Sequence, residues 1–387
     1  MNGHLSSKMT KVLIAAVFGA SFLSTGLAQI AKITKVASVE ASAPLAMTIG
    51  GRVLVEKDPA RAFGAKKYIY QWPGTYFTAS FRGTEAYFGV GEGKQILHVA
   101  VDQQLPVVLV KPDSGLYRIS GLTDDVHTVL IEVVTESQAG PNSFGGFSLP
   151  PSASPLPAPH ASREIEFIGD SHTVGYGNTS TKRECTEDEV WETTDNSLAY
   201  GPLTAKHYGA EYQINAVSGR GVVRNYNGSP GDQLPVAYPY VLFDKQGLYA
   251  DSSWNPQIVV LALGTNDFST PLNAGEKWKS RDQLHTDYEA TYVAFLKKLR
   301  TRYPDAFFIL WATDGADGEI QAEAQKVTRQ VQADGDTRLV FIPVNGLAMS
   351  ACHWHPSTQD DEIVAGKLID FIDQHPQLGQ PDLAGGH

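Results

Sequence analysis

A proline-rich segment at residues 149–159 divides the chain into two stretches with different hydrophobic patterns. The segment reads LPPSASPLPAP, and prolines at this density favour an extended, stiff conformation that has no core of its own. Before it, short runs rich in Val, Tyr, Phe and Thr are separated by turn residues; after it, apolar runs alternate with amphipathic stretches of helical length. The segment therefore predicts a boundary between two domains of different fold class.

The first stretch predicts β-strands with no helix between them. Runs such as 76–81 and 127–134 are rich in β-branched and aromatic residues and alternate as strands do. Turns rich in Gly, Pro and Asn separate such runs at intervals that are typical of β-sandwiches. We expect a β-sandwich or jelly-roll domain over residues 45–148.

The second stretch predicts a mostly parallel α/β sheet. Short apolar strands that alternate with amphipathic helices form βαβ units. The expected strands are 164–168, 212–217, 258–263, 306–311 and 339–342, and the expected helices are 197–208, 283–303, 318–332 and 358–374. We expect a linker over 149–162, the α/β domain over 163–376 and a flexible tail over 377–387.

Composition narrows the class of partner. The chain has 387 residues, 42% of them hydrophobic, which is enough for a large buried core. Its formal net charge of −11 argues against binding to nucleic acid, because that binding depends on clustered Lys and Arg. An uncharged substrate fits the composition better, and we expect a monomer.

The N-terminus resembles a signal peptide. Lys8 and Lys11 precede an apolar stretch at 12–23, and small residues follow up to Ala28. We expect residues 1–28 to be cleaved, which would place the protein outside the cytoplasm, secreted or periplasmic. A membrane anchor is the alternative, but the apolar stretch is shorter than the roughly 20 residues that span a bilayer.

The chain contains two cysteines, Cys185 and Cys352. An even pair in an exported protein is compatible with one disulfide, which we expect between these two residues. The alternative is two buried free thiols that pack as small apolar side chains. No Cys/His cluster has the spacing of a zinc site, so the sequence implies neither a metal nor another cofactor.

Four unusual polar segments hold the candidate chemistry, three of them directly after predicted strands. They are GDS at 169–171, SGRG at 218–221, GTND at 264–267 and CHWHP at 352–356. In open α/β sheets, reactive groups gather at the carboxyl ends of the strands, so we expect these segments to lie together. An activated serine needs an imidazole to accept its proton and donors for the oxyanion that forms on an attacked ester carbonyl.

The segments supply each of these groups. Ser171 is the predicted nucleophile, His355 the general base and then acid, and Asn266 an oxyanion donor through Nδ2. The backbone amides of Ser171 and Gly219 complete the predicted oxyanion hole, since glycine lets a backbone amide approach the reacting carbonyl.

Each assignment has a simpler alternative. Ser171 could cap a helix, Asn266 could form an Asx-turn and Gly219 could be only a turn glycine. His353 lies two residues from His355, which we favour as the base. We expect Asp170 and Asp267 to make structural hydrogen bonds.

The order of these segments resembles the SGNH (GDSL) hydrolase superfamily, and residues 51–374 are more specifically similar to carbohydrate esterase family 2. The second resemblance rests on QWPGT at 71–75, GGF at 145–147, IEFIGDS at 165–171, VGYGN at 174–178, SGRGVVRNY at 218–226 and WHP at 354–356. It implies a jelly roll followed by a flavodoxin-like parallel sheet flanked by helices. It also implies deacetylation of xylan, glucomannan or simple acetylated sugars.

One position departs from the superfamily pattern. Many SGNH hydrolases carry an Asp three residues before the catalytic His, and this chain has Cys352 there. The resemblance to family 2 implies a Ser171–His355 dyad, with the imidazole oriented by a backbone carbonyl, which we place at Trp354. The Trp354 side chain either contacts a sugar ring or simply packs.

The function of the first domain and of the whole chain stays open at this point. The first domain is either a carbohydrate-binding module or a platform that shapes one wall of the cleft. Alternatives for the whole chain are a lipid or aryl esterase of the same superfamily and a secreted carbohydrate-binding protein without activity. We expect an acetylesterase that acts on polysaccharides and that, once the leader is cleaved, has no membrane partner.

Overall fold

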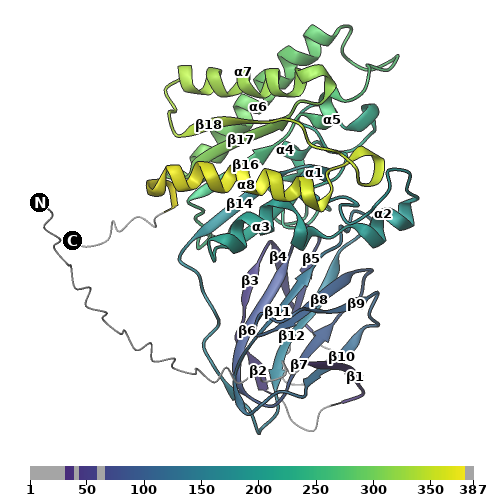
Figure 1. Cartoon of the computed structure of the whole chain (residues 1–387), viewed down its shortest axis with the longest axis vertical. Coiled ribbons are helices and arrows are strands. Elements are labelled where there is room, and N and C mark those ends of the chain that lie inside the picture. Colours follow the sequence, from purple (N-terminus) through teal and green to yellow (C-terminus); the bar gives the residue numbers. More distant parts are fainter. Residues whose placement is uncertain (1–30, 39–42, 59–65, 380–387) are drawn as a thin grey trace, which may run out of the picture.

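The computed structural model describes residues 31–38, 43–58 and 66–379, which form two parts stacked on each other (Figure 1). The expected signal peptide at 1–28 and residues 380–387 of the expected tail lie outside the described residues. No helix within the described ranges is both long and apolar enough to cross a membrane.

Two antiparallel sheets make up the first part. One has the strand order β1-β10-β7-β12-β5-β4 with β2 beside β12, and the other has β13-β6-β11-β8-β9 with β3 beside β6. The strands are β1 (Lys32–Val36), β2 (Ala43–Leu45), β3 (Thr48–Gly50), β4 (Val53–Lys57), β5 (Lys66–Tyr70), β6 (Tyr76–Gly83), β7 (Ala86–Val90), β8 (Ile96–Val101), β9 (Val107–Val110), β10 (Gly115–Ser120), β11 (Asp125–Val133), β12 (Asn142–Leu149) and β13 (Ser154–Pro155). Buried aromatic residues such as Phe77, Phe88 and Phe144 fill the space between the sheets. The predicted all-β class is confirmed, but the strands extend from Lys32 to Pro155, beyond the expected bounds of 45–148. β13 lies within the expected linker, because it pairs with the edge of β6.

A parallel sheet flanked by helices forms the second part, as predicted. Its strand order is β15-β14-β16-β17-β18, the order of flavodoxin-like folds. The strands are β14 (Glu164–Gly169), β15 (Glu211–Ala216), β16 (Ile258–Ala262), β17 (Phe307–Thr313) and β18 (Leu339–Val344). The longer helices are α3 (Tyr200–His207), α6 (Arg281–Arg302), α7 (Glu319–Ala333) and α8 (Thr358–Gln374).

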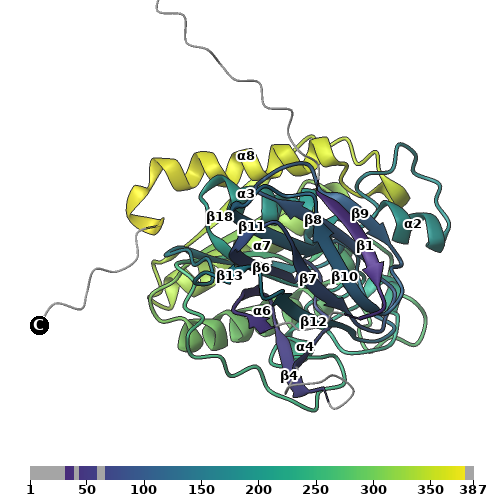
Figure 2. The same cartoon turned by 90° about the horizontal axis from the view of Figure 1, so that it is seen from below.

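Alternation along the central strands explains why helices cover both faces of this sheet. Ile165 and Phe167 of β14 belong to the core that includes α3 and α8, whereas Ile168 belongs to the core that includes α6 and α7. Strands buried on both faces read as continuous apolar runs, which is the pattern of β16. Seen from below, α8 runs along one side of the molecule and α6 lies towards the other side (Figure 2).

Short helices account for most of what the predicted elements leave out. They are α1 (Ser171–Val174), α2 (Glu187–Thr193), α4 (Leu234–Ala237) and α5 (Thr265–Phe268), with 3₁₀ turns η1 (Asn196–Leu198), η2 (Tyr226–Gly228), η3 (Ala316–Gly318), η4 (Cys352–Trp354) and η5 (Pro376–Gly379). Segments of one or two turns are too short to show a 3.6-residue hydrophobic period.

The two parts share a buried interface. Arg52 of the first part is fully buried, its Nη2 lies 3.3 Å from Glu166 Oε1 of β14, and its guanidinium stacks over the Tyr238 ring at 4.2 Å. The Trp72 indole donates to the Tyr240 carbonyl at 3.1 Å. A buried charge of this kind is expensive unless it is paired, so these contacts fix the two parts to each other.

Candidate active site

A tight strand-to-helix turn presents Ser171 at the carboxyl end of β14. Asp170 caps α1, its Oδ1 accepting the His172 amide at 3.1 Å, and Ser171 is the first helical residue. Any β-carbon at Gly169 would overlap the Thr173 side chain, so only glycine fits. The Ser171 side chain is consequently fixed at the sheet edge where the other polar segments gather.

His355 approaches Ser171 from the loop between β18 and α8. Its Nε2 lies 2.9 Å from Ser171 Oγ. Its Nδ1 lies 2.9 Å from the Cys352 carbonyl oxygen and 3.2 Å from the His353 carbonyl oxygen. Carbonyls only accept hydrogen bonds, so Nδ1 carries the proton and the Nε2 lone pair faces the serine hydroxyl.

The orienting carbonyl differs from the one predicted. We placed it at Trp354, but the recorded acceptors belong to Cys352 and His353. The reason is backbone geometry: His353 and Trp354 have φ of 52° and 59°, which turns the chain through a left-handed bend. The Trp354 side chain remains 58% exposed.

A second loop holds this bend in place. Cys185 and Cys352 form a disulfide. The His353 amide donates to the Arg183 carbonyl at 2.7 Å, and His353 Nε2 donates to the Cys185 carbonyl at 2.8 Å. Arg183 Nε donates to the Met349 carbonyl at 2.8 Å. His353 is thus engaged in holding the loop rather than in contact with Ser171.

Gly219 and Asn266 flank Ser171 because β15 and β16 flank β14. Gly219 has φ of 80°, a conformation that other residues rarely adopt. Within the described part of the chain, neither the Gly219 nor the Ser171 amide donates to another backbone group. Asn266 Nδ2 donates to Asp170 Oδ2 at 3.1 Å and to the Arg220 carbonyl at 2.9 Å, which fixes the direction of the side-chain amide.

Two buried carboxyl groups support these turns. Asp267 accepts the amides of Val222, Val223 and Arg224, each at 2.9 Å, and so ties the loop after β15 to α5. Burial raises the pKa of Asp170 to about 7 and that of Asp267 to about 6. Their recorded contacts are the structural hydrogen bonds that we predicted for both residues.

Burial also keeps the imidazoles of the site neutral. It lowers the pKa of His355 to about 4, against the effect of the two carbonyl hydrogen bonds. The pKa of His172 falls to about 3, mainly by burial and also through the proximity of His355. A neutral His355 is the form that accepts a proton from serine.

Sequence reasoning missed two aromatic neighbours of His355. The Tyr176 ring lies 4.3 Å from the His355 ring at an interplanar angle of 33°, and the His172 ring lies 5.6 Å away, edge to face. Both follow Ser171 within five residues, on α1 and its C-terminal turn, and Tyr176 also lies in the VGYGN segment on which the family resemblance rests. They pack against the imidazole and restrict its movement.

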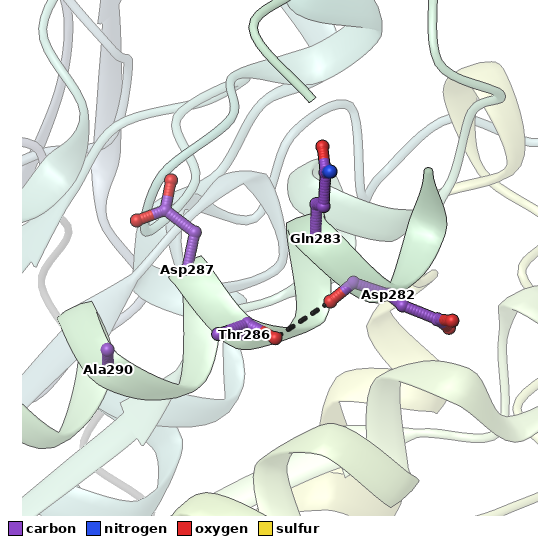
Figure 3. Close-up of a pocket in the computed structure, with 5 residues that line it drawn as sticks. All are labelled: Asp282, Gln283, Thr286, Asp287 and Ala290. Atoms are coloured by element: carbon purple, nitrogen blue, oxygen red, sulfur yellow. Dashed lines mark hydrogen bonds between the residues drawn. The ribbon is translucent and has the colours of Figure 1, made fainter. Parts of the chain in front are cut away.

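Among the described residues, neither a metal-binding cluster nor the pocket on α6 adds a group to the site. No cluster of three or more His, Cys, Asp or Glu residues suited to a metal occurs among the residues described. A shallow depression of about 420 Å³ lies on the outer surface of α6, and Figure 3 shows the residues that line it: Asp282, Gln283, Thr286, Asp287 and Ala290. It contains none of the predicted site residues.

Two family descriptions match the chain. Residues 60–159 match "Carbohydrate esterase 2 N-terminal", and residues 167–366 match "GDSL-like Lipase/Acylhydrolase family". An acetylxylan esterase / glucomannan deacetylase of Cellvibrio japonicus is 46% identical over 338 residues, which cover 87% of this chain and 93% of that protein. The chain belongs to carbohydrate esterase family 2.

Solved structures of carbohydrate esterases agree with this membership. One, whose active site displays divergent catalytic and non-catalytic binding functions, has a TM-score of 0.82 and 45% identity, covering 87% of this chain and 99% of that one. A family two esterase from Clostridium thermocellum, solved with cellohexaose, has a TM-score of 0.72 and 27% identity over 86% of this chain and all of that one. The predicted family and the predicted esterase class are confirmed.

Proposed function

We propose that this carbohydrate esterase removes O-acetyl groups from polysaccharides such as xylan and glucomannan, or from smaller acetylated sugars. The observation that carries the mechanism is the 2.9 Å contact between Ser171 Oγ and His355 Nε2, with Nδ1 held by carbonyls. The substrate class is supported by the relative that is named an acetylxylan esterase / glucomannan deacetylase.

The proposed reaction proceeds through an acyl-enzyme. Ser171 Oγ attacks the acetyl carbonyl while its proton passes to His355 Nε2. The resulting oxyanion is stabilised by the amides of Ser171 and Gly219 and by Asn266 Nδ2. Asn266 gives up its hydrogen bond to the Arg220 carbonyl and donates to the oxyanion instead. The ester bond to the sugar breaks and its oxygen takes the proton from His355. Water then attacks the acetyl-serine with the same base, releasing acetate.

We further propose that the protein acts outside the cytoplasm. The basic and apolar character of residues 1–28 supports an export signal, and the Cys185–Cys352 disulfide suits an oxidising compartment. A secreted location also places the enzyme where polysaccharides are accessible.

The test compares the wild-type protein with Ser171→Ala. Acetate release is measured from acetylated xylan and acetylated glucomannan, and 4-nitrophenyl esters of increasing acyl length are tested in parallel. We expect the variant to lose turnover and to keep its unfolding temperature, and wild-type activity to fall as the acyl chain lengthens. Activity retained by the variant would exclude Ser171 as the nucleophile, and a preference for long acyl chains would move the assignment to lipid esterases.

A further inference from the structure

A loop of the first part reaches the turn that carries Gly219. The loop connects β11 to β12, and Glu136 Oε1 accepts the Ser218 amide at 2.8 Å. Gln138 Nε2 donates to the Ser218 carbonyl at 3.0 Å and to Glu136 Oε1 at 3.1 Å. Both backbone polar groups of Ser218 are therefore held by side chains of the β-sandwich.

The Ser218 carbonyl and the Gly219 amide belong to the same peptide group. This group is planar and trans, so the C=O and the N–H point in opposite directions. A hydrogen bond that fixes the Ser218 carbonyl consequently fixes the direction of the Gly219 N–H. Donation to the carbonyl also polarises the peptide group and makes its N–H a stronger donor.

The direction of the Gly219 N–H must be fixed by residues outside its own turn. Glycine has more conformational freedom than any other residue, and Gly219 has φ of 80°. Apart from its two chain neighbours, no described residue has an atom within 4 Å of the place where a β-carbon would be. Side-chain packing at this position therefore cannot hold the amide. The Gly219 carbonyl accepts the Tyr226 amide at 2.9 Å, but it belongs to the next peptide group. The peptide group that carries the Gly219 N–H is held by the contacts to Ser218.

We propose that Glu136 and Gln138 are positioning residues for the Gly219 amide, so that the β-sandwich completes the oxyanion hole of the esterase. The inference rests on the proposed role of Gly219 in ester hydrolysis.

Gln71 anchors the loop that carries Glu136 and Gln138. Its Nε2 donates to the Ser137 carbonyl at 3.2 Å and its Oε1 accepts the Phe243 amide at 3.0 Å. The loop is thus attached to both parts of the molecule.

The surroundings of Glu136 show that this carboxyl group borders the site. Burial raises the pKa of Tyr176 to about 12, and the charges of Glu187 and Glu136 contribute to the increase. Tyr176 is the residue whose ring packs against His355 at 4.3 Å. A negative charge this close to the site would destabilise the oxyanion of the transition state. Glu136 therefore supports catalysis through the oxygen that accepts the Ser218 amide, and not through its charge.

Three substitutions test separately the hydrogen-bond acceptor at Glu136, the hydrogen-bond donor at Gln138 and the charge of Glu136. Glu136→Ala removes the acceptor for the Ser218 amide, and Gln138→Met removes the donor to its carbonyl at an exposed position with little change of shape. Glu136→Gln keeps an acceptor oxygen and removes the charge. Glu132→Ala is the matched control, because Glu132 also bridges the two parts, accepting the Tyr212 hydroxyl at 3.1 Å, but at the opposite end of β15.

The assay is kcat and KM for 4-nitrophenyl acetate, together with the unfolding temperature. We expect Glu136→Ala and Gln138→Met to lower kcat about tenfold to hundredfold, somewhat less than the roughly 10²–10³-fold lost when an oxyanion donor is removed. KM should change little, because the amide acts mainly in the transition state. Glu136→Gln and Glu132→Ala should keep kcat within about threefold of the wild type, by the same reasoning.

Two results would overturn the proposal. One is a wild-type kcat in both Glu136→Ala and Gln138→Met. The other is an equal loss in Glu136→Ala, Glu136→Gln and Glu132→Ala, which would show that only the packing of the two parts matters. Failure of the proposed function is recognised separately, since Ser171→Ala would then remain active whatever the Glu136 variants do.

Discussion

Removal of the Cys185–Cys352 disulfide should reduce stability much more than activity. The bond closes a loop of 167 residues. In the chain-entropy treatment, closing a loop of this length lowers the entropy of the unfolded chain by about 17 cal/mol/K, which stabilises the folded state by about 5 kcal/mol at 25 °C. The double variant Cys185→Ser, Cys352→Ser should therefore lose stability of this order, with strain and residual structure reducing the measured value.

Activity should survive because hydrogen bonds hold the same loop. The Arg183 and Cys185 carbonyls accept from His353, and Arg183 binds the carbonyls of Ala348 and Met349, all without the sulfur bond. The Cys352 carbonyl that orients His355 is part of the backbone and is kept when the side chain becomes serine. We expect kcat at 25 °C to stay within about threefold of the wild type, a difference below 1 kcal/mol in activation free energy.

The assay is urea unfolding followed by tryptophan fluorescence, with esterase activity measured on the same samples. A wild-type protein kept oxidised and one treated with a thiol reductant provide the matched controls. Unchanged stability of the double variant would refute the loop-entropy estimate. A kcat more than tenfold lower in a variant that is still folded would show that the disulfide, and not the hydrogen bonds, orients His355.

Three further predictions concern the site itself. Asn266→Ala should lower kcat for 4-nitrophenyl acetate roughly 10²–10³-fold with little change in KM, and unchanged kcat would remove Asn266 from the oxyanion hole. Gly219→Ala should cost about 1 kcal/mol or more in urea unfolding, because its φ of 80° strains a β-carbon, and should also lower kcat; wild-type values in both would contradict the required geometry. Because burial lowers the pKa of His355 to about 4, kcat/KM should decline only as the pH approaches 4, and an acid limb centred near 6.5 would contradict this. Because the pKa of His355 is lower in the folded than in the unfolded protein, its burial favours folding most above about pH 6.5, and this contribution to stability is lost as the pH falls through that value towards 4.

The strands of the second part could be predicted because their burial follows from local pattern. Every residue of β16 is buried, and the run Ile258–Ala262 is apolar throughout, so the strand and its start are visible in the sequence, and its end was predicted one residue too late. The start of α8 was equally visible, because Ser357 and Asp360 form a capping box directly after Pro356. Parallel strands then bring Ser171, Gly219 and Asn266 to one edge whatever the lengths of the connecting loops.

Contacts between the two parts could not be predicted in this way. Glu136 and Ser218 are 82 residues apart, and neither belongs to a periodic element. Nothing in a single sequence shows which loop of a β-sandwich faces which end of a parallel sheet. The same holds for Arg52 and Glu166, where the sequence shows an ordinary arginine after a glycine turn and the structure shows a fully buried ion pair.

The loop before His355 shows why the orienting carbonyl was misplaced by two residues. The Cys352 carbonyl accepts both the backbone amide of His355, at 3.1 Å, and its Nδ1, at 2.9 Å. A residue three positions before the histidine thus supplies the acceptor from its backbone, at the position where many SGNH hydrolases use an aspartate side chain. Because the backbone performs the orienting role, the side chain at 352 is available for a different one, and here it forms the disulfide to Cys185. The left-handed bend at His353 and Trp354 thus allows the Cys352 carbonyl to orient His355 while the Cys352 side chain is bonded to the second loop.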